Sequence, residues 1–169
     1  NSGIENKISH TYTENGVYTI NVSGAVATIE VLDFNCFDQE NNYQSNITAA
    51  NIEKLTLLKS CLFYSGNLSN LNTSGNTALE LLELGFNQIT SLDVTNNPNL
   101  KQANLRYNQL TGLDVSQNPN LELLWVDGSQ ISMLDLSNNS KLRVLMAREN
   151  NLSTIDFTNN LNLERFDVA

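Results

Sequence analysis

The sequence predicts a solenoid in which short coils stack, with parallel β-strands on one face and turns on the other. Three features indicate this fold class: a leucine recurs every 21 residues, further apolar positions keep the same period, and turn-forming residues fill the second half of each period. The recurring leucines are Leu58, Leu79, Leu100, Leu121, Leu142 and Leu163. A fixed period of this length is typical of stacked repeats, because a single coil cannot bury its own apolar edge.

The first half of each period predicts a short strand. Alignment on these leucines places apolar residues at the fourth, sixth, eleventh and fourteenth positions as well. The fourth position holds Cys61, Leu82, Ala103, Leu124, Leu145 and Phe166, and the sixth holds Phe63, Leu84, Leu105, Val126, Ala147 and Val168. The fourteenth position includes Leu92, Leu113 and Leu134. Because alternate residues of a strand share a face, we expect the first, fourth and sixth positions to point into one continuous core.

The spacing follows the pattern L-x-x-L-x-L-x-x-N-x-L, which resembles the leucine-rich repeat family. The asparagine of that pattern, at the ninth position, is Asn87, Asn108 and Asn150, while Gly66 and Ser129 replace it in two coils. The resemblance implies that this asparagine hydrogen-bonds backbone groups where the chain leaves the strand, a role that suits an amide able to donate and accept. The coils that carry Gly66 and Ser129 are therefore expected to be looser.

The second half of each coil predicts turns and short irregular segments on the convex side. These halves read L-D-V-T-N-N-P-N, L-D-V-S-Q-N-P-N, L-D-L-S-N-N-S-K and I-D-F-T-N-N-L-N. Side chains of Asn, Ser and Thr compete for backbone hydrogen bonds and so favour turns over helix. The coil is also short for this family and leaves little room for a full helix.

An aspartate column follows the fourteenth position and has two interpretations. Its members are Asp93, Asp114, Asp135 and Asp156, with Asn72 in the preceding coil. Clustered carboxylates could form a calcium ladder. Alternatively, each Asp caps its own turn by accepting backbone N–H groups. The second interpretation is preferred, because the glycine-rich calcium-repeat pattern is absent and the uncharged Asn72 occupies the same slot.

Residues 1–57 are predicted to form a β-rich cap with an irregular first coil, and residues 58–169 the solenoid proper. Alternation at Tyr18, Ile20 and Val22, after Gly16, indicates a strand. The pattern H-x-Y-x-x-x-G-x-Y-x-I-x-V resembles the closing hairpin of the polycystic-kidney-disease-type β-sandwich. Residues 27–34 predict a further strand, and the polar residues 38–49 predict a loop. The sequence stops inside a strand without a polar cap, so we expect either self-association there or a longer natural protein.

Composition narrows the possible partners. The chain has 169 residues, enough for one domain with a good core, and a formal net charge of −9. This charge argues against nucleic acid and anionic membrane surfaces as partners. An apolar run of membrane-spanning length and a signal peptide are both missing from the sequence. Cys61 occupies a core position, so we expect a buried hydrophobic role, although a disulfide with Cys36 is the alternative.

The candidate binding residues are those that point outward from the predicted strands and strand ends. They form a proposed recognition patch centred on Trp125: Tyr64, Phe86, Arg106, Tyr107, Trp125, Asp127 and Arg148. Trp, Tyr and Arg contribute most of the energy in many interfaces. The alternative is that these side chains only pack along neighbouring strands.

An enzyme is not expected. The single histidine, His10, lies outside the repeats, and the G-x-S-x-G, H-E-x-x-H and G-x-x-x-x-G-K-[ST] motifs are missing. Without such a constellation, and without a C-x-x-C metal motif, no cofactor or metal is predicted.

The L-D-V-S-x-N-P-x-L units are similar to those of internalin-like and Bacteroides-type bacterial surface proteins. This resemblance implies a secreted or surface-anchored protein. It also implies adhesion to, or recognition of, an extracellular protein or glycan through the strand-bearing face. The alternatives are a structural spacer in a larger surface protein and an accessory glycan-binding protein. The sequence leaves the oligomeric state open.

Overall fold

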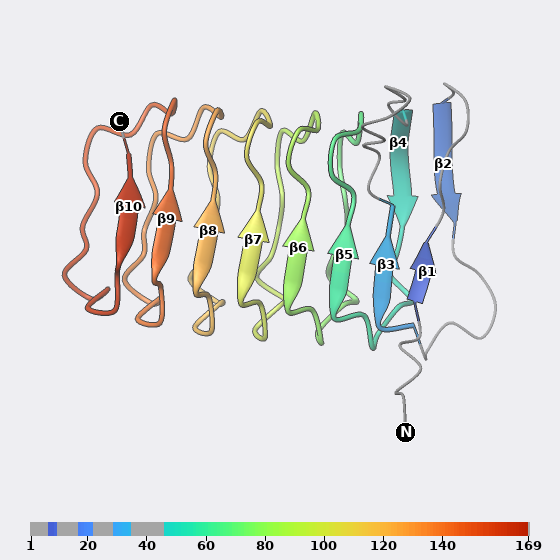
Figure 1. Cartoon of the computed structure of the whole chain (residues 1–169), viewed down its shortest axis with the longest axis horizontal. Coiled ribbons are helices and arrows are strands. Elements are labelled where there is room, and N and C mark those ends of the chain that lie inside the picture. Colours follow the sequence, from blue (N-terminus) through green and yellow to red (C-terminus); the bar gives the residue numbers. More distant parts are fainter. Residues whose placement is uncertain (1–6, 10–16, 22–28, 35–45, 169) are drawn as a thin grey trace.

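The computed structural model describes residues 7–9, 17–21, 29–34 and 46–168. Their strands form two sheets, and within each sheet the strands pair in parallel (Figure 1). The large sheet has the order β1-β3-β5-β6-β7-β8-β9-β10, and the small one pairs β2 with β4. The strands of the large sheet are β1 (Lys7–Ser9), β3 (Val31–Asp33), β5 (Ser60–Leu62), β6 (Leu81–Glu83), β7 (Gln102–Asn104), β8 (Leu123–Trp125), β9 (Val144–Met146) and β10 (Arg165–Asp167). The small sheet contains β2 (Val17–Asn21) and β4 (Asn46–Asn51).

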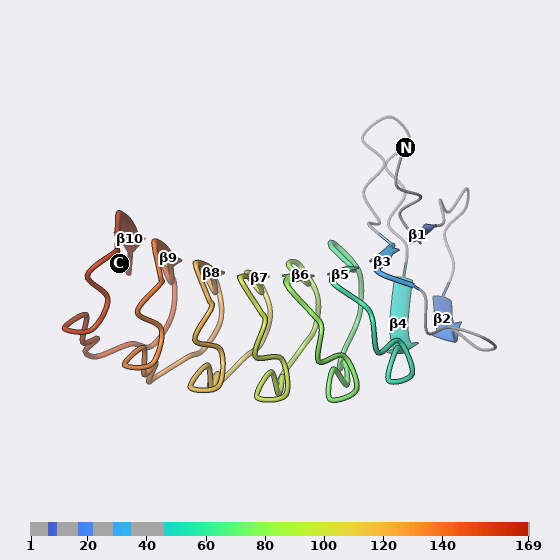
Figure 2. The same ribbon diagram turned by 90° about the horizontal axis from the view of Figure 1, so that it is seen from below.

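The register confirms the predicted solenoid. From β5 onward each strand pairs in parallel with the strand 21 residues later, so that Cys61 lies beside Leu82 and Leu82 beside Ala103. Figure 2 shows the strands along the concave side of the stack and the turns along the opposite side. The described part of the chain contains strands and turns but no helix, as expected for the convex side.

A single buried cluster runs through the coils. The first, fourth and sixth columns are buried from Leu58 to Ala147, and Leu92, Leu113 and Leu134 belong to the same cluster. Burying each leucine contributes about 1.5–3 kcal/mol, so the stacked aliphatic columns are the main source of stability. In the last coil Phe166 remains 56% exposed, because β10 has a neighbouring strand on one side only among the described residues.

The asparagines of the ninth position form the predicted backbone bonds. Asn108 donates from Nδ2 to the carbonyls of Leu84 and Leu105, both at 2.9 Å, and accepts the N–H of Ile89 at 3.0 Å. Asn87 and Asn150 make the matching contacts in their own coils. Where Ser129 replaces the asparagine, its hydroxyl oxygen is buried without a hydrogen-bond partner among the described residues.

A second asparagine column lies inside the turn side of the stack. Its members are Asn76, Asn97, Asn118, Asn139 and Asn160, all buried. Each donates from Nδ2 to two carbonyls of the preceding coil, as Asn118 does to Val94 and Asn97 at 2.9 Å. These bonds connect neighbouring coils on the turn side, opposite the sheet. The ninth-position asparagines connect them at the strand ends, so each side of the stack has its own repeated hydrogen bonds.

The aspartate column caps turns, as preferred from the sequence. Asp114 Oδ1 accepts the N–H of Ser116 at 2.9 Å, and the other three aspartates accept the equivalent N–H group. Asn72 makes the same bond to Ser74. These hydrogen bonds lower the pKa of all four carboxyl groups below the usual range, so the column is ionised at neutral pH.

The amino-terminal segment is partly as expected. Val17–Asn21 is a strand, and Val31–Asp33 joins the large sheet beside β5, so the strand predicted in residues 27–34 is confirmed over three residues. The loop predicted over residues 38–49 is wrong from Asn46 onward, because β4 pairs in parallel with β2. A polar segment can form this strand because the pairing uses backbone groups, and the side chain of Ile47 is buried in the core.

Several expectations concern residues outside the described ranges. These include His10, Gly16 and Cys36, as well as most of the segment that resembles a β-sandwich hairpin. The division of the chain at residue 57 also stays a prediction. Cys61 is a buried thiol without a disulfide bond, and its burial raises the pKa of the thiol.

Candidate functional site

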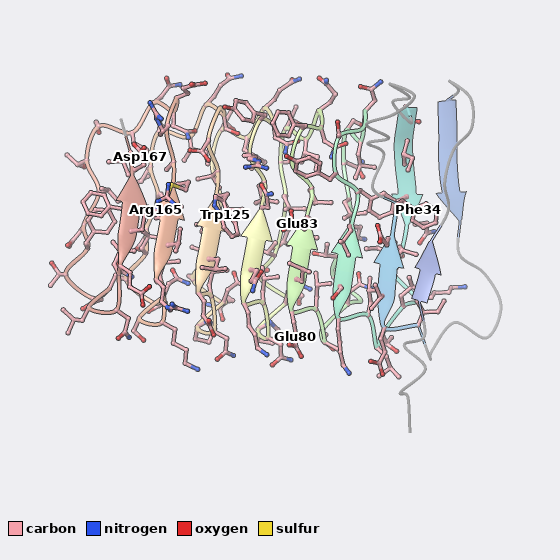
Figure 3. All side chains as sticks on the ribbon, viewed as in Figure 1. Phe34, Glu80, Glu83, Trp125, Arg165 and Asp167 are labelled. Atoms are coloured by element: carbon pink, nitrogen blue, oxygen red, sulfur yellow. The ribbon has the colours of Figure 1, made fainter. Side chains whose placement is uncertain are left out.

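The strand-bearing side presents partly buried apolar residues on β8 and β9. The parallel register places Leu123 beside Val144 and Trp125 beside Met146. We call these four residues the strand-face patch. Leu123, Trp125 and Val144 are partly exposed, whereas Met146 is buried. The patch is therefore apolar, and it lies toward the C-terminal end of the large sheet, next to β10 (Figures 1 and 3).

Trp125 lies on β8 in a cross-strand row between Asn104 and Met146 (Figure 3). The two neighbours are only 7% and 8% exposed. Both lie in register with the large indole, and a neighbouring ring can cover smaller side chains on a sheet surface. Among the described residues the indole N–H has no hydrogen-bond partner, so it remains available as a donor.

Four other predicted residues come together beyond the ends of β5, β6 and β7. The ring of Phe86 lies 5.3 Å from that of Tyr64 and 4.5 Å from that of Tyr107, between centroids. The guanidinium of Arg106 lies over the rings of Tyr64 and Phe86, at 5.4 and 5.5 Å, and donates from Nη2 to the hydroxyl of Tyr64 at 2.5 Å. We call Tyr64, Phe86, Arg106 and Tyr107 the aromatic rim.

The aromatic rim depends on an unusual backbone column. The eighth residue of each coil is left-handed, with φ of 58° at Phe86 and 51° at Tyr107. For bulky residues this conformation is an outlier that costs energy, yet these two side chains are 41% and 43% exposed. Glycine would adopt the same backbone without strain. Ser65 and Glu149 share this conformation, so the strain belongs to the repeat, and at Phe86 and Tyr107 it holds a large, partly exposed ring.

Two glycines provide room for the rings. A Cβ at Gly128 would lie 2.4 Å from Cδ1 of Tyr107, and one at Gly85 would lie 2.8 Å from Cε2 of Tyr64. Each ring therefore lies against the backbone of the next coil. This role of Gly85 and Gly128 was not predicted, although a glycine in the same column as aromatic residues of neighbouring coils is a visible signal in the sequence.

A polar network supports the aromatic rim from the strand side. Asn104 Nδ2 donates to Glu83 Oε2 at 2.8 Å, and the backbone N–H of Arg106 approaches Asn104 Oδ1 at 3.4 Å. Burial raises the pKa of the Glu83 carboxyl, while the bond from Asn104 and the charge of Arg106 act in the opposite direction. Figure 3 shows Glu83 on β6 and Trp125 on β8, two strands apart in the sheet.

The remaining two predicted residues form a separate polar link. Asp127 Oδ1 accepts the backbone N–H of Arg148 at 3.1 Å, and the Arg148 guanidinium lies 3.5 Å from the carboxylate of Asp167. The structure thus divides the predicted patch. Tyr64, Phe86, Arg106 and Tyr107 are together, whereas Trp125 makes no ring contact with them in the described structure and belongs to the strand-face patch.

The chemistry of both parts suits binding. Within the described ranges, no three His, Cys, Asp or Glu side chains are grouped so that they could hold a metal ion. The same ranges contain no helix long and apolar enough to cross a membrane. What the surface does offer is partly exposed aromatic rings, an indole N–H donor and amide groups.

Comparison with known proteins identifies the fold. No protein-family model matches the sequence, and no curated protein matches it significantly. Among solved structures, the functional domain of InlJ from Listeria monocytogenes is similar, with 29% identity, a TM-score of 0.58, and coverage of 75% of this chain and 33% of that one. InlP from the same organism has 25% identity and a TM-score of 0.66, covering 83% of this chain and 42% of that one.

Internalin C2 from Listeria monocytogenes has 21% identity and a TM-score of 0.72, covering 85% of this chain and 62% of that one. The chain therefore spans less than two thirds of the length of each of these three proteins. Together with the parallel solenoid described above, these similarities show that the chain has the leucine-rich repeat fold, with internalins among its structural neighbours.

Proposed function

We propose that this chain is a non-catalytic binding module that recognises an extracellular protein through its strand-bearing side. Its leucine-rich repeat architecture suggests a protein-interaction module, and solenoids of this kind offer extended concave surfaces to their partners. The similarity to internalins supports a location outside a bacterial cell, either secreted or anchored to the surface.

The observation that carries the proposal is the set of partly exposed rings on one side of the molecule. The indole N–H of Trp125 has no hydrogen-bond partner within the described ranges, and Phe86 and Tyr107 remain exposed at strained backbone positions. Interface energy concentrates in such aromatic anchors. We place the centre of the protein contact at the strand-face patch, with Asp127, Arg148 and the aromatic rim at its border.

A capture experiment with matched baits tests this function. Immobilised wild type, Trp125→Ala and Met133→Ala would be exposed to enzymatically deglycosylated extracellular proteins, followed by mass spectrometry. Met133 is the control because it is 77% exposed in the turn half of its coil. We expect a protein that wild type and Met133→Ala retain and Trp125→Ala releases. If all three baits retain the same proteins, the strand-face patch is not the binding site.

A structural spacer is the alternative, because the solenoid is long and the two asparagine columns hydrogen-bond neighbouring coils to each other. In that case no retained protein would depend on Trp125.

A further inference from the structure

We infer that Glu83 recognises a cationic side chain, Lys or Arg, of the protein partner, and that the apolar stem of this side chain lies against the indole of Trp125. This inference rests on the proposed protein recognition and deepens it, because it states which chemistry the partner presents beside the strand-face patch. Three features support it: the cross-strand row that holds both residues, the apolar surroundings of the carboxylate, and the lack of a counter-charge within the described ranges.

Glu83 and Trp125 belong to one cross-strand row on the strand-bearing side. The register pairs Glu83 with Asn104 and Asn104 with Trp125 (Figure 3), so their backbones are two strands apart, which is about 10 Å. Asn104 is only 7% exposed, which leaves Glu83 and Trp125 as the accessible groups of this part of the row. A Lys or Arg side chain carries its charge at the end of a long apolar stem. One such side chain can therefore contact the indole and the carboxylate together.

The carboxylate of Glu83 is partly buried beside apolar neighbours. Leu62 pairs with Glu83 from β5, and Leu81 precedes it by two residues on β6, so both leucines share its face of the sheet. Burial raises the pKa of the Glu83 carboxyl, and this effect exceeds the opposite effects of Asn104 and Arg106. Covering the carboxylate further without a counter-charge would cost free energy. A partner that lacks a matching cation is therefore disfavoured, so Glu83 contributes to specificity.

Glu83 has no ion-pair partner among the residues that the structure describes. Its Oε2 accepts a hydrogen bond from Asn104 at 2.8 Å, whereas its Oε1 accepts none within the same ranges. The guanidinium of Arg106 lies over the rings of Tyr64 and Phe86 and donates to the hydroxyl of Tyr64. Its buried Nε has no hydrogen-bond partner in the described part of the chain, so this nitrogen does not bond to the carboxylate either. Glu83 Oε1 is thus open to a cation from outside the chain.

Charge complementarity favours a basic partner. The cross-strand row of Glu83 also contains Asp33 and Asp167 and, over its described length, no Lys or Arg. The whole chain has a net charge of −9, which attracts cationic surfaces and speeds association with them. The indole of Trp125 adds to this selection, because a cation is attracted to the face of an aromatic ring. The matching partner surface is a Lys or Arg surrounded by apolar side chains.

Titration of the full chain with matched peptides tests the inference. The probes are capped pentapeptides with the order alanine, leucine, X, leucine, alanine, in which X is arginine, lysine or citrulline, the uncharged analogue of arginine. Trp125 is the single tryptophan, so its indole N–H gives one identifiable NMR signal at the site. We expect the arginine or the lysine peptide to shift this signal saturably and the citrulline peptide to bind about fivefold more weakly. Glu83→Gln, which keeps an acceptor for Asn104, should weaken binding of the charged peptide by a similar factor.

Glu53→Gln is the matched control. It removes the same charge from an exposed turn residue and keeps the acceptor that Asn72 uses, so it should bind the peptides as wild type does. Equal losses in Glu83→Gln and Glu53→Gln would overturn the site, because they would show attraction to the whole acidic chain.

Three other results would also overturn it: no saturable shift of the indole signal, equal binding of the charged and citrulline peptides, or equal binding by Glu83→Gln and wild type. None of these results changes the capture experiment. A protein that wild type retains and Trp125→Ala releases would still support the proposed function, so the two proposals can fail separately.

Discussion

Ser129→Asn should stabilise the protein, although it adds a polar group to a partly buried site. In three other coils the ninth residue is asparagine and bridges two coils through its amide. In this coil the Ser129 hydroxyl is buried without a partner among the described residues. The position of the other asparagines indicates that the introduced side chain would donate to the carbonyls of Leu105 and Val126 and accept the N–H of Leu110.

The magnitude follows from the bonds seen at the matching positions. At Asn108 three bonds have lengths of 2.9–3.0 Å, and each such bond contributes about 1 kcal/mol net. Ordering the longer side chain costs about 1 kcal/mol. Ser129→Asn should therefore raise the free energy of unfolding by about 2 kcal/mol. The reverse change, Asn108→Ser, should lower it by about 2–4 kcal/mol, because Ile89 N–H and the Leu105 carbonyl lose their partner.

Urea unfolding, followed by the fluorescence of the single tryptophan, measures the free energy, and hydrogen exchange locates the effect. The amide of Leu110 should become more protected in Ser129→Asn, and that of Ile89 less protected in Asn108→Ser. The reasoning is refuted if Ser129→Asn is neutral or destabilising while the exchange of the Leu110 amide stays as in wild type.

Three further changes test other parts of the structure. Asn118→Ala removes two buried 2.9 Å bonds between coils and should cost about 1–3 kcal/mol in thermal unfolding, whereas Asn120→Ala, at an exposed bond, should cost less than about 0.5 kcal/mol. Gly128→Ala places a Cβ at φ 64° and 2.4 Å from the ring of Tyr107. The substitution should lower the free energy of unfolding by about 1–2 kcal/mol through the backbone alone and shift the ring signals of Tyr107 in NMR spectra. Unchanged ring signals would contradict the close contact between Gly128 and Tyr107. The folded-state pKa values of the aspartate column are lowered, so the stabilisation from these carboxylates is present above the unfolded pKa and is lost as pH falls through the folded values. The urea midpoint should therefore drop below about pH 4, and Asp114→Asn should make that drop smaller. An unchanged pH profile would argue against turn capping by these carboxylates.

Features that follow from the 21-residue period could be predicted from the sequence. The core columns, the ninth-position asparagines and the turn-capping aspartates each repeat, so one physical role explains a whole column. The buried column that includes Asn118 repeats as well. It was missed because an asparagine in a turn is usually explained by the turn itself, and only the stacking of coils shows that its amide points inward.

Features outside the period were harder to predict. The pairing of β2 with β4 joins segments about thirty residues apart that do not repeat, so neither spacing nor apolar pattern indicated it. The division between Trp125 and the aromatic rim was also hidden. Both belong to outward positions, but the left-handed backbone at Phe86 and Tyr107 carries their rings beyond the sheet, while Trp125 stays on it.

The central claim is that the strand-bearing side of the solenoid is the recognition surface. Hydrogen–deuterium exchange of the chain, alone and with the Trp125-dependent partner from the capture experiment, tests this claim most directly. The account predicts that protection on binding is concentrated in peptides covering β8 and β9, residues 123–125 and 144–146. Protection confined to the turn side, in peptides around Asp114 and Asp135, with β8 and β9 unchanged, would contradict it.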